Sequence, residues 1–170
     1  PRFDDVRTRP HGAASWDRLA TGCDTHPVGG DSVEQAGEDP DPESAESADF
    51  YDEIYSRKDY EGEATRVAAL LRQRNPTAAT LLDVACGTGR HLEHLTESFA
   101  CEGIDINPAL LEIAHRRCGD VTFTRADMTA FELGRTFDAV TCLFSAIGYA
   151  RTVDRLDTAI EAMARHLEPG

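Results

Sequence analysis

From residue 50 onward, helical stripes of apolar residues alternate with short apolar runs. One stripe ends near Arg74, where Asn75 and Pro76 stop a helix. Another helix opens at Asn107, which is a favourable N-cap, with Pro108 at the first helical position. Near the end of the chain, apolar residues at alternating spacings of three and four predict an amphipathic helix: Val153, Leu156, Ile160, Met163 and Leu167.

Four short apolar runs lie between these helical stretches and predict buried strands: residues 80–84, 101–106, 121–124 and 137–143. Strands that alternate with helices form a parallel sheet through right-handed crossovers, with helices on both faces. The pattern therefore predicts an α/β fold, a three-layer αβα sandwich around a parallel Rossmann-like sheet. Because the last helix should lead into a fifth strand, we expect a domain truncated after its fourth strand and helix, with residues 137–143 as an unpaired edge.

The first 49 residues have a different composition. They carry 12 acidic and 4 basic residues, and residues 29–49 hold eight acids, no base and almost no large apolar side chain. Such a segment cannot bury enough apolar surface to offset its chain entropy. We therefore expect a disordered acidic tail over residues 1–49 and one folded domain over residues 50–170.

Charge and composition narrow the possible partners. The 170 residues carry a net charge of −14, which argues against a nucleic-acid partner because no basic face is available. No apolar run approaches the about 20 residues that cross a bilayer. Five cysteines without a C-x-x-C pair favour a reducing, cytoplasmic setting over a disulfide framework. The sequence predicts neither a membrane partner nor a particular oligomeric state.

The turn after the first predicted strand carries the most informative chemistry. Gly87 and Gly89 permit close approach of the backbone to a ligand, and the following helix offers free N–H groups. Asp105 ends the second predicted strand, where an acid can accept from ribose hydroxyls. A dinucleotide fingerprint requires a third glycine where Leu92 stands, and Asp83 suits a cationic amino group better than a pyrophosphate. The layout therefore favours S-adenosyl-L-methionine over a nicotinamide dinucleotide.

Five segments resemble, in order, motifs of the class I S-adenosylmethionine-dependent methyltransferases; the last, residues 166–170 (HLEPG), resembles the turn before their fifth strand. Residues 83–89 (DVACGTG) resemble motif I, and residues 103–108 (GIDINP) resemble the ribose-binding segment. Residues 125–128 (RADM) resemble the adenine-binding segment, and residues 137–145 (FDAVTCLFS) resemble motif IV. The resemblance implies a methyltransferase core from residue 50 to the end of the chain. Ala85 departs from the pattern, because many members have glycine there.

Three segments also resemble a narrower group, the amino-sugar N,N-dimethyltransferases of the desosamine type: residues 50–60, 84–95 and 144–149. In that group the tyrosine matching Tyr55 lies by the cofactor and the substrate amine, and the segment matching residues 144–149 borders the substrate. The resemblance implies N-methylation of a small-molecule acceptor, with Tyr55 and Tyr149 as candidate catalytic residues that orient the amine. The alternatives are C- or O-methylation of a quinone-like or other small acceptor, and a cofactor-binding fragment without catalysis.

The resemblance also assigns cofactor contacts. Asp83 would bind the methionine ammonium, directly or through water, and residues 85–89 would wrap the methionine end with backbone groups. Asp105 would hold the ribose, Ile106 would pack on the adenine, and Asp127 would accept from the adenine amino group. The complete set of expected cofactor-binding residues is Tyr55, Asp83, Ala85, Cys86, Gly87, Gly89, Asp105, Ile106, Asp127, Met128 and Phe144.

Several of these residues have structural alternatives. Asp127 suits the N-cap of a short turn over the residues that follow it. Cys86 is better explained as a small packed residue than as a reactive thiol. Tyr55 also suits a packing aromatic residue of an N-terminal helix. His91 and His94 have helical spacing but no partner cluster, so we predict no metal site.

Overall fold

The computed structural model describes residues 53 and 55–169, and the predicted acidic tail lies outside them. The helices and strands follow in the order expected of alternating α and β segments. In chain order they are α2 (Tyr60–Arg74), β1 (Thr80–Val84), α3 (Leu92–Leu95), β2 (Ala100–Asp105), α4 (Pro108–Arg117), β3 (Thr122–Arg125), β4 (Ala139–Thr141), the 3-10 helix η1 (Ala146–Ala150) and α5 (Val153–Arg165).

The four strands form one parallel sheet in the order β3-β2-β1-β4. The chain moves outward from β1 to β2 and β3, and then returns to place β4 on the other side of β1. This change of direction is a topological switch point, and ligands of open α/β sheets bind outside the carboxyl ends of the strands at such a point. The carboxyl end of β1 is therefore the expected position of a ligand site.

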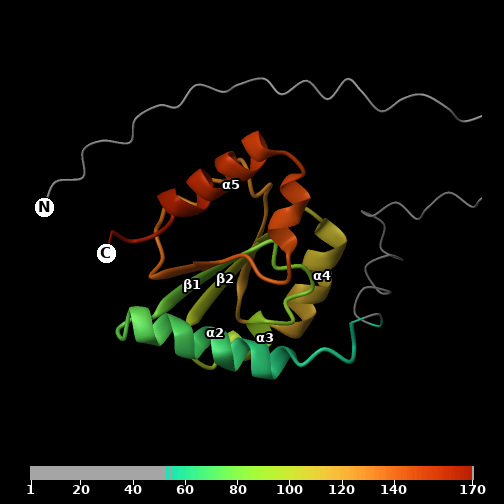
Figure 1. Ribbon diagram of the computed structural model, residues 1–170. Coiled ribbons are helices and arrows are strands. Elements are labelled where there is room, and N and C mark those ends of the chain that lie inside the picture. The colour runs from blue at the N-terminus through green and yellow to red at the C-terminus, as the bar shows by residue number, and fades with distance from the viewer. Residues whose placement is uncertain (1–52, 54, 170) are drawn as a thin grey trace, which may run out of the picture. The chain divides into compact units, whose positions relative to one another are not determined.

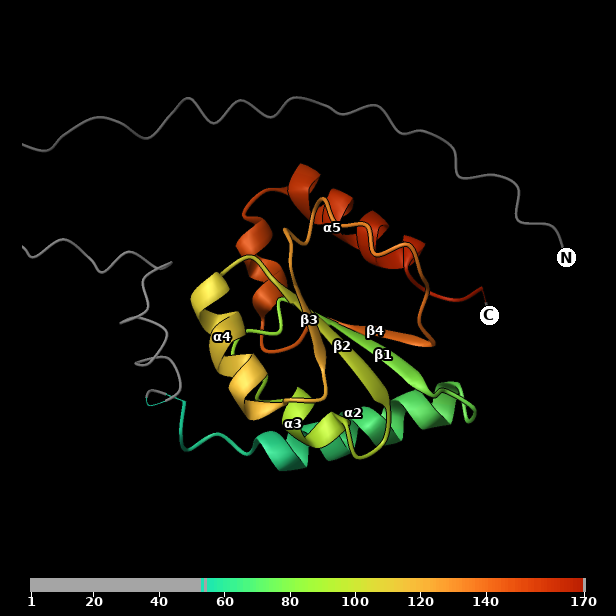
Figure 2. The ribbon, with the colours of Figure 1, turned by 180° about the vertical axis from the view of Figure 1, so that it is seen from behind.

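Helices cover both faces of the sheet, which confirms the predicted three-layer sandwich. Helices α2 and α3 lie on one face and α5 on the other, as two opposite views show (Figures 1 and 2). Adjacent residues of β1 point to opposite layers: Leu81 packs with Leu92, Leu95 and residues of α2 and α4, whereas Leu82 packs with Ala162 of α5. Both leucines of β1 are fully buried, so the central strand is held from both sides.

Local sequence explains where the helices begin. The Asp59 side chain accepts from the Gly62 N–H at 2.9 Å and starts α2, and the Asn107 side chain accepts from the Ala109 N–H at 2.9 Å and starts α4. The predicted N-cap at Asn107 is therefore confirmed. In the described part of the chain, no helix is both long and apolar enough to cross a membrane.

Two elements are shorter than the sequence pattern predicted. Helix α3 is a single turn, and Phe99 lies beyond it, although Phe99 is buried as its spacing suggested. Strand β4 covers only Ala139–Thr141 of the expected residues 137–143. After β4 the chain turns through Phe144, whose positive φ of 55° cannot continue a strand.

The outer edge of the sheet is partly paired rather than open throughout. The Phe137 N–H donates to the His166 carbonyl at 2.8 Å, and the Glu168 N–H donates to the Phe137 carbonyl at 2.9 Å. These bonds form a parallel bridge between Phe137 and Leu167, just before β4 begins. The expectation of a wholly unpaired edge over residues 137–143 is therefore wrong at Phe137.

Candidate functional site

The turn after β1 has the backbone that its glycines suggested. Gly87 and Gly89 have φ values of 56° and 75°, in the left-handed region that glycine adopts at low cost. A Cβ on Gly89 would also lie 3.2 Å from the Cβ of Ala114, so this residue must be small for α4 to pack. Ala85 has a φ of 58°, a conformation that costs a non-glycine residue roughly 1–2 kcal/mol. That strain explains physically why glycine suits position 85.

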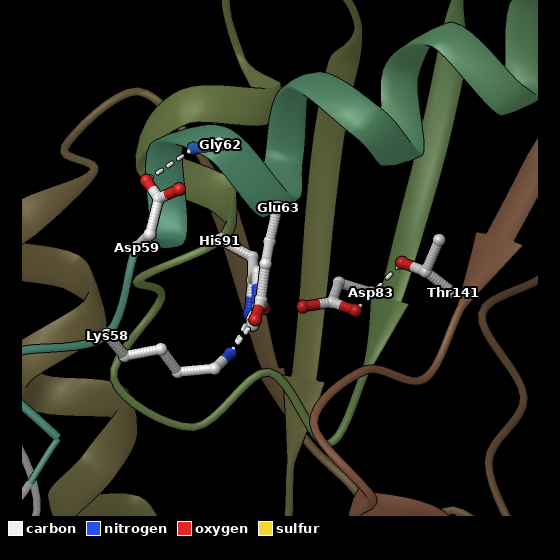
Figure 3. A network of polar contacts seen from close by, with 7 residues as sticks. All are labelled: Lys58, Asp59, Gly62, Glu63, Asp83, His91 and Thr141. Atoms are coloured by element: carbon white, nitrogen blue, oxygen red, sulfur yellow. Dashed lines mark hydrogen bonds and ion pairs between the residues drawn. The ribbon is translucent and has the colours of Figure 1, made fainter.

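Asp83 is buried at the carboxyl end of β1 and pairs in register with Thr141 of β4. The Thr141 hydroxyl donates to Asp83 Oδ1 at 2.8 Å (Figure 3). Burial raises the pKa of Asp83 to about 7, against the effect of this hydrogen bond. The Thr141 hydroxyl is neutral and does not compensate a negative charge. A positively charged ligand group beside Asp83 would compensate the charge of the ionised carboxylate.

Asp105 lies at the carboxyl end of the neighbouring strand β2 and faces the glycine turn. Its carboxylate accepts from the Gly87 N–H at 2.8 Å and from the Asn107 N–H at 2.9 Å. Burial raises the pKa of Asp105, while these two backbone donors act in the opposite direction. The structure thus brings Asp83, Gly87 and Asp105 together at adjacent strand ends, as the sequence predicted.

The residues expected to contact adenine differ from one another in burial and in hydrogen bonding. Asp127 accepts from the Thr129 N–H at 2.9 Å and the Thr129 hydroxyl at 2.8 Å, as a turn-capping residue does. Its second oxygen accepts from Arg155 of α5 at 3.2 Å, and these donors, the Thr129 N–H first, lower the pKa of Asp127. Ile106 is 50% exposed, whereas Met128 packs half-buried against the core. The structure therefore supports the capping role of Asp127, and its adenine contact stays a prediction.

Tyr55 and Phe144 are far apart in the sequence and meet in the structure. Their rings pack edge to face with 4.8 Å between centroids. Phe144 and Ser145 have φ values of 55° and 59°, so the turn after β4 is strained at two consecutive residues. Tyr149 lies on η1 and is 69% exposed. The contact places Tyr55 against Phe144, the first residue of the segment 144–149 that is expected to border the substrate, and the catalytic roles of both tyrosines stay predictions.

Cys86 is packed rather than poised for reaction. A Cβ placed on Gly103 would lie 2.9 Å from its Sγ atom, so the thiol fills the space left by that glycine. Burial raises the pKa of Cys86 well above its usual range, with the carboxylates of Asp83 and Asp105 acting in the same direction. The interpretation of Cys86 as a small packed residue is therefore the one that the structure supports.

A polar network that the sequence analysis missed lies beside this region (Figure 3). Lys58 forms an ion pair with Glu63, and the His91 Nε2 atom lies 2.9 Å from Glu63 Oε2. The hydrogen bond with His91 is the main cause that lowers the pKa of Glu63, and burial lowers the pKa of His91. His91 thus pairs with a helix carboxylate. Among residues 53 and 55–169, no three His, Cys, Asp or Glu side chains are grouped as a metal site.

One signal in the sequence pointed to this network. Lys58 is the only lysine of the chain, and it stands directly before Asp59, the residue that caps α2. Thr141 was also missed, although a polar residue inside a buried apolar strand needs a hydrogen-bond partner. In the parallel register that partner is Asp83.

A parallel sheet with a glycine turn and two buried carboxylates at adjacent strand ends defines a nucleoside-binding α/β domain. Comparison with known proteins identifies the family. Residues 81–170 match the family described as "Methyltransferase domain", and the chain belongs to this family. The recognition of a methyltransferase from its motifs is therefore confirmed.

Two curated relatives are N,N-dimethyltransferases of amino sugars. The dTDP-3-amino-3,4,6-trideoxy-alpha-D-glucopyranose N,N-dimethyltransferase of Streptomyces venezuelae is 47% identical over 126 residues, 72% of this chain and 53% of that protein. The dTDP-3-amino-3,6-dideoxy-alpha-D-glucopyranose N,N-dimethyltransferase of Streptomyces fradiae is 48% identical over 129 residues, 74% of this chain and 51% of that protein. The chain thus spans about half the length of the curated relatives it matches.

Solved structures show the same fold. The crystal structure of DesVI from Streptomyces venezuelae has a TM-score of 0.70 at 46% identity and covers 72% of this chain and 53% of that one. The S-adenosylmethionine-bound amino pentose methyltransferase CalS10 from Micromonospora echinaspora has a TM-score of 0.69 at 44% identity, with 71% and 52% covered. The chain has the Rossmann-like fold of class I methyltransferases, as its sequence predicted.

Proposed function

We propose that this chain carries the cofactor-binding core of an enzyme that transfers a methyl group from S-adenosyl-L-methionine to the amino group of a nucleotide-linked amino sugar. The observation that carries the proposal is the pair of buried carboxylates, Asp83 and Asp105, on either side of the glycine turn. The names of three relatives at 45–48% identity supply the acceptor class.

The geometry supports binding of different parts of the cofactor at the carboxyl ends of β1 and β2. The methionine ammonium would pair with Asp83, because a cation compensates the charge of a buried carboxylate. The ribose hydroxyls would donate to Asp105, which already accepts two backbone N–H groups. Ile106 offers a half-exposed apolar side chain for the adenine ring.

Methyl transfer requires little acid–base catalysis from the protein. S-adenosyl-L-methionine would supply a methyl group that its sulfonium already activates, with the carbon–sulfur electron pair left on S-adenosylhomocysteine. The site would hold the neutral acceptor amine in line with that carbon–sulfur bond, and the product ammonium would lose its proton to water. The protein supplies proximity and alignment, which are worth about 7–11 kcal/mol in well-oriented reactions. Tyr55 and Tyr149 would orient the amine.

The alternatives have weaker support. A C-methyltransferase of ubiquinone and menaquinone biosynthesis from Nitrobacter hamburgensis is 36% identical, and 61% of this chain and 44% of that protein are covered. This identity is lower than that of the amino-sugar N,N-dimethyltransferases. A small-molecule acceptor, the lack of nucleic-acid and membrane partners, and a cytoplasmic location stay predictions.

Calorimetric titration with S-adenosylhomocysteine and with NAD tests the cofactor. We expect binding of the first and not of the second; the reverse result would refute the cofactor assignment. Incubation of the full-length protein with S-adenosyl-L-methionine and a panel of dTDP-linked amino sugars, followed by mass spectrometry, tests the acceptor. Methylation of a quinone-type acceptor but of no amino sugar would contradict the proposed acceptor.

A further inference from the structure

The turn after β4 needs support from outside the sheet. Phe144 and Ser145 both adopt left-handed backbone conformations, which non-glycine residues keep only where their surroundings hold them. The Phe144 ring is packed by the segment before α2: the Tyr55 ring packs perpendicular to it with 4.8 Å between centroids, and the Lys58 ammonium lies 4.0 Å from the Phe144 centroid. Support for this turn therefore comes from residues 55–58.

Lys58 is itself fixed in place. Its side chain is only 15% exposed, its ammonium forms an ion pair with Glu63, and it lies 4.4 Å from the Tyr60 ring centroid. The His91 Nε2 atom lies 3.3 Å from the same ammonium. A lysine side chain is long and flexible, so an ammonium held by a carboxylate between two aromatic rings has lost that freedom.

These contacts join three separate segments. The first contains Tyr55 and Lys58, the second begins with the glycine turn and reaches His91, and the third follows β4 and contains Phe144. Each segment carries residues predicted to bind the cofactor or to border the acceptor. Figure 3 shows that Lys58, Glu63 and His91 converge from the chain before α2, from α2 itself and from the turn after β1.

We propose that Lys58 is a positioning residue, whose ammonium is fixed by Glu63 and His91 and holds the strained Phe144 turn against Tyr55 on the acceptor side of the site. The acceptor role rests on the proposed function. The positive charge is the essential feature, because the electron-rich face of an aromatic ring attracts a cation and a neutral chain of equal length offers only packing.

Kinetics of the full-length protein test this role with three variants. Lys58→Met keeps the apolar stem and removes the charge, and Lys58→Arg keeps a cation that stacks on aromatic rings. Arg72→Met is the matched control: Arg72 is on α2, the helix that follows Lys58, and its guanidinium lies 5.3 Å from the centroid of the Phe99 ring rather than against Phe144.

We expect Lys58→Met to lower kcat/KM for the amino-sugar acceptor about tenfold, the loss of one desolvated cation–π contact. The dissociation constant of S-adenosylhomocysteine is expected to change less than about threefold, since Lys58 contacts Glu63, His91 and Phe144 rather than Asp83 or Asp105, the proposed partners of the methionine ammonium and the ribose. Lys58→Arg should retain at least about a third of the wild-type value, and Arg72→Met should match wild type. Unchanged kinetics in Lys58→Met, or an equal loss of cofactor affinity, would overturn the proposal.

Hydrogen exchange tests the same proposal without an acceptor. In Lys58→Met we expect the amides of residues 144–150 to exchange about tenfold faster, with β1 unchanged, because a local opening exposes only the turn. Exchange equal to wild type in that segment would overturn the positioning role even if no acceptor were methylated. An inactive wild-type protein with the expected exchange pattern would refute the proposed acceptor and leave the role of Lys58 supported.

Discussion

Replacing Asp83 by asparagine should stabilise the empty protein while it removes cofactor binding. Asparagine has nearly the same shape, and its side-chain oxygen can still accept from Thr141, as Asp83 Oδ1 does at 2.8 Å. It carries no charge, so the cost of burying an ionised carboxylate disappears. The same change removes the partner of the methionine ammonium, so S-adenosylhomocysteine affinity should fall.

The size of the effect follows from the pKa. Burial raises the pKa of Asp83 from 3.8 to about 7 in the folded state. The native protein therefore holds a proton that the unfolded chain releases, so the unfolding free energy falls as pH rises from about 4 to 7. The slope is about 1.4 kcal/mol per pH unit, and the full penalty above pH 7 is about 4 kcal/mol.

Urea unfolding of wild type and Asp83→Asn at about pH 5, 6, 7 and 8 measures the difference between their unfolding free energies. The advantage of Asp83→Asn over wild type should grow by about 2 kcal/mol between pH 5 and pH 7 and level off near pH 8. Asp138→Asn is a suitable control, because the folded state lowers the pKa of Asp138 through N–H donors of residues 79 and 80. A stability difference for Asp83→Asn that is independent of pH would refute the raised pKa.

Three further substitutions test other parts of the structure. Asp105→Ala should weaken S-adenosylhomocysteine binding by about 1.5–3 kcal/mol in calorimetry, because the ribose loses a charged acceptor; unchanged affinity would refute the ribose contact. Ala85→Gly should raise the unfolding free energy by up to about 1 kcal/mol by relieving a φ of 58°; a lower value would show that the Ala85 methyl group is needed. His166→Phe should lower the unfolding free energy by about 1–3 kcal/mol, because the Leu133 N–H loses its acceptor and the Ala162 carbonyl loses its partner. An unchanged urea midpoint would contradict a stabilising role of these two hydrogen bonds.

The sequence predicted the parts of the fold that local patterns control. Strand residues 80–84 were located without error, because an apolar run between a helix stop and a glycine turn has few other interpretations. Asp83, Gly87 and Asp105 were expected to contact parts of one cofactor, and the carboxyl ends of neighbouring parallel strands do lie at one edge of the sheet. The Gly87–Asp105 hydrogen bond shows that the turn after β1 meets the end of β2, whereas the cofactor contacts stay predictions.

Packing across the layers was less predictable. The apolar stripe of α5 predicted a buried face through Val153 and Ile160, yet these side chains are 71% and 51% exposed. The residues of α5 that are fully buried are Ala159 and Ala162, because small side chains let the helix approach the sheet closely. Periodicity therefore identified the helix correctly, whereas the face toward the sheet depended on contacts that a single sequence does not specify.

The raised pKa of Asp83 also couples cofactor binding to pH. The ammonium of the cofactor requires an ionised partner, whereas burial favours the protonated form of Asp83 in the empty site up to a pH of about 7. Binding therefore releases a proton below that pH, and S-adenosylhomocysteine affinity should rise about tenfold per pH unit until pH 7 and then level off. Calorimetry in two buffers of different ionisation enthalpy would detect the released proton. Asp83→Asn should lose this pH dependence, since asparagine does not titrate. A wild-type affinity that stays constant from about pH 5 to pH 7 would show that Asp83 is not the group that binds the ammonium.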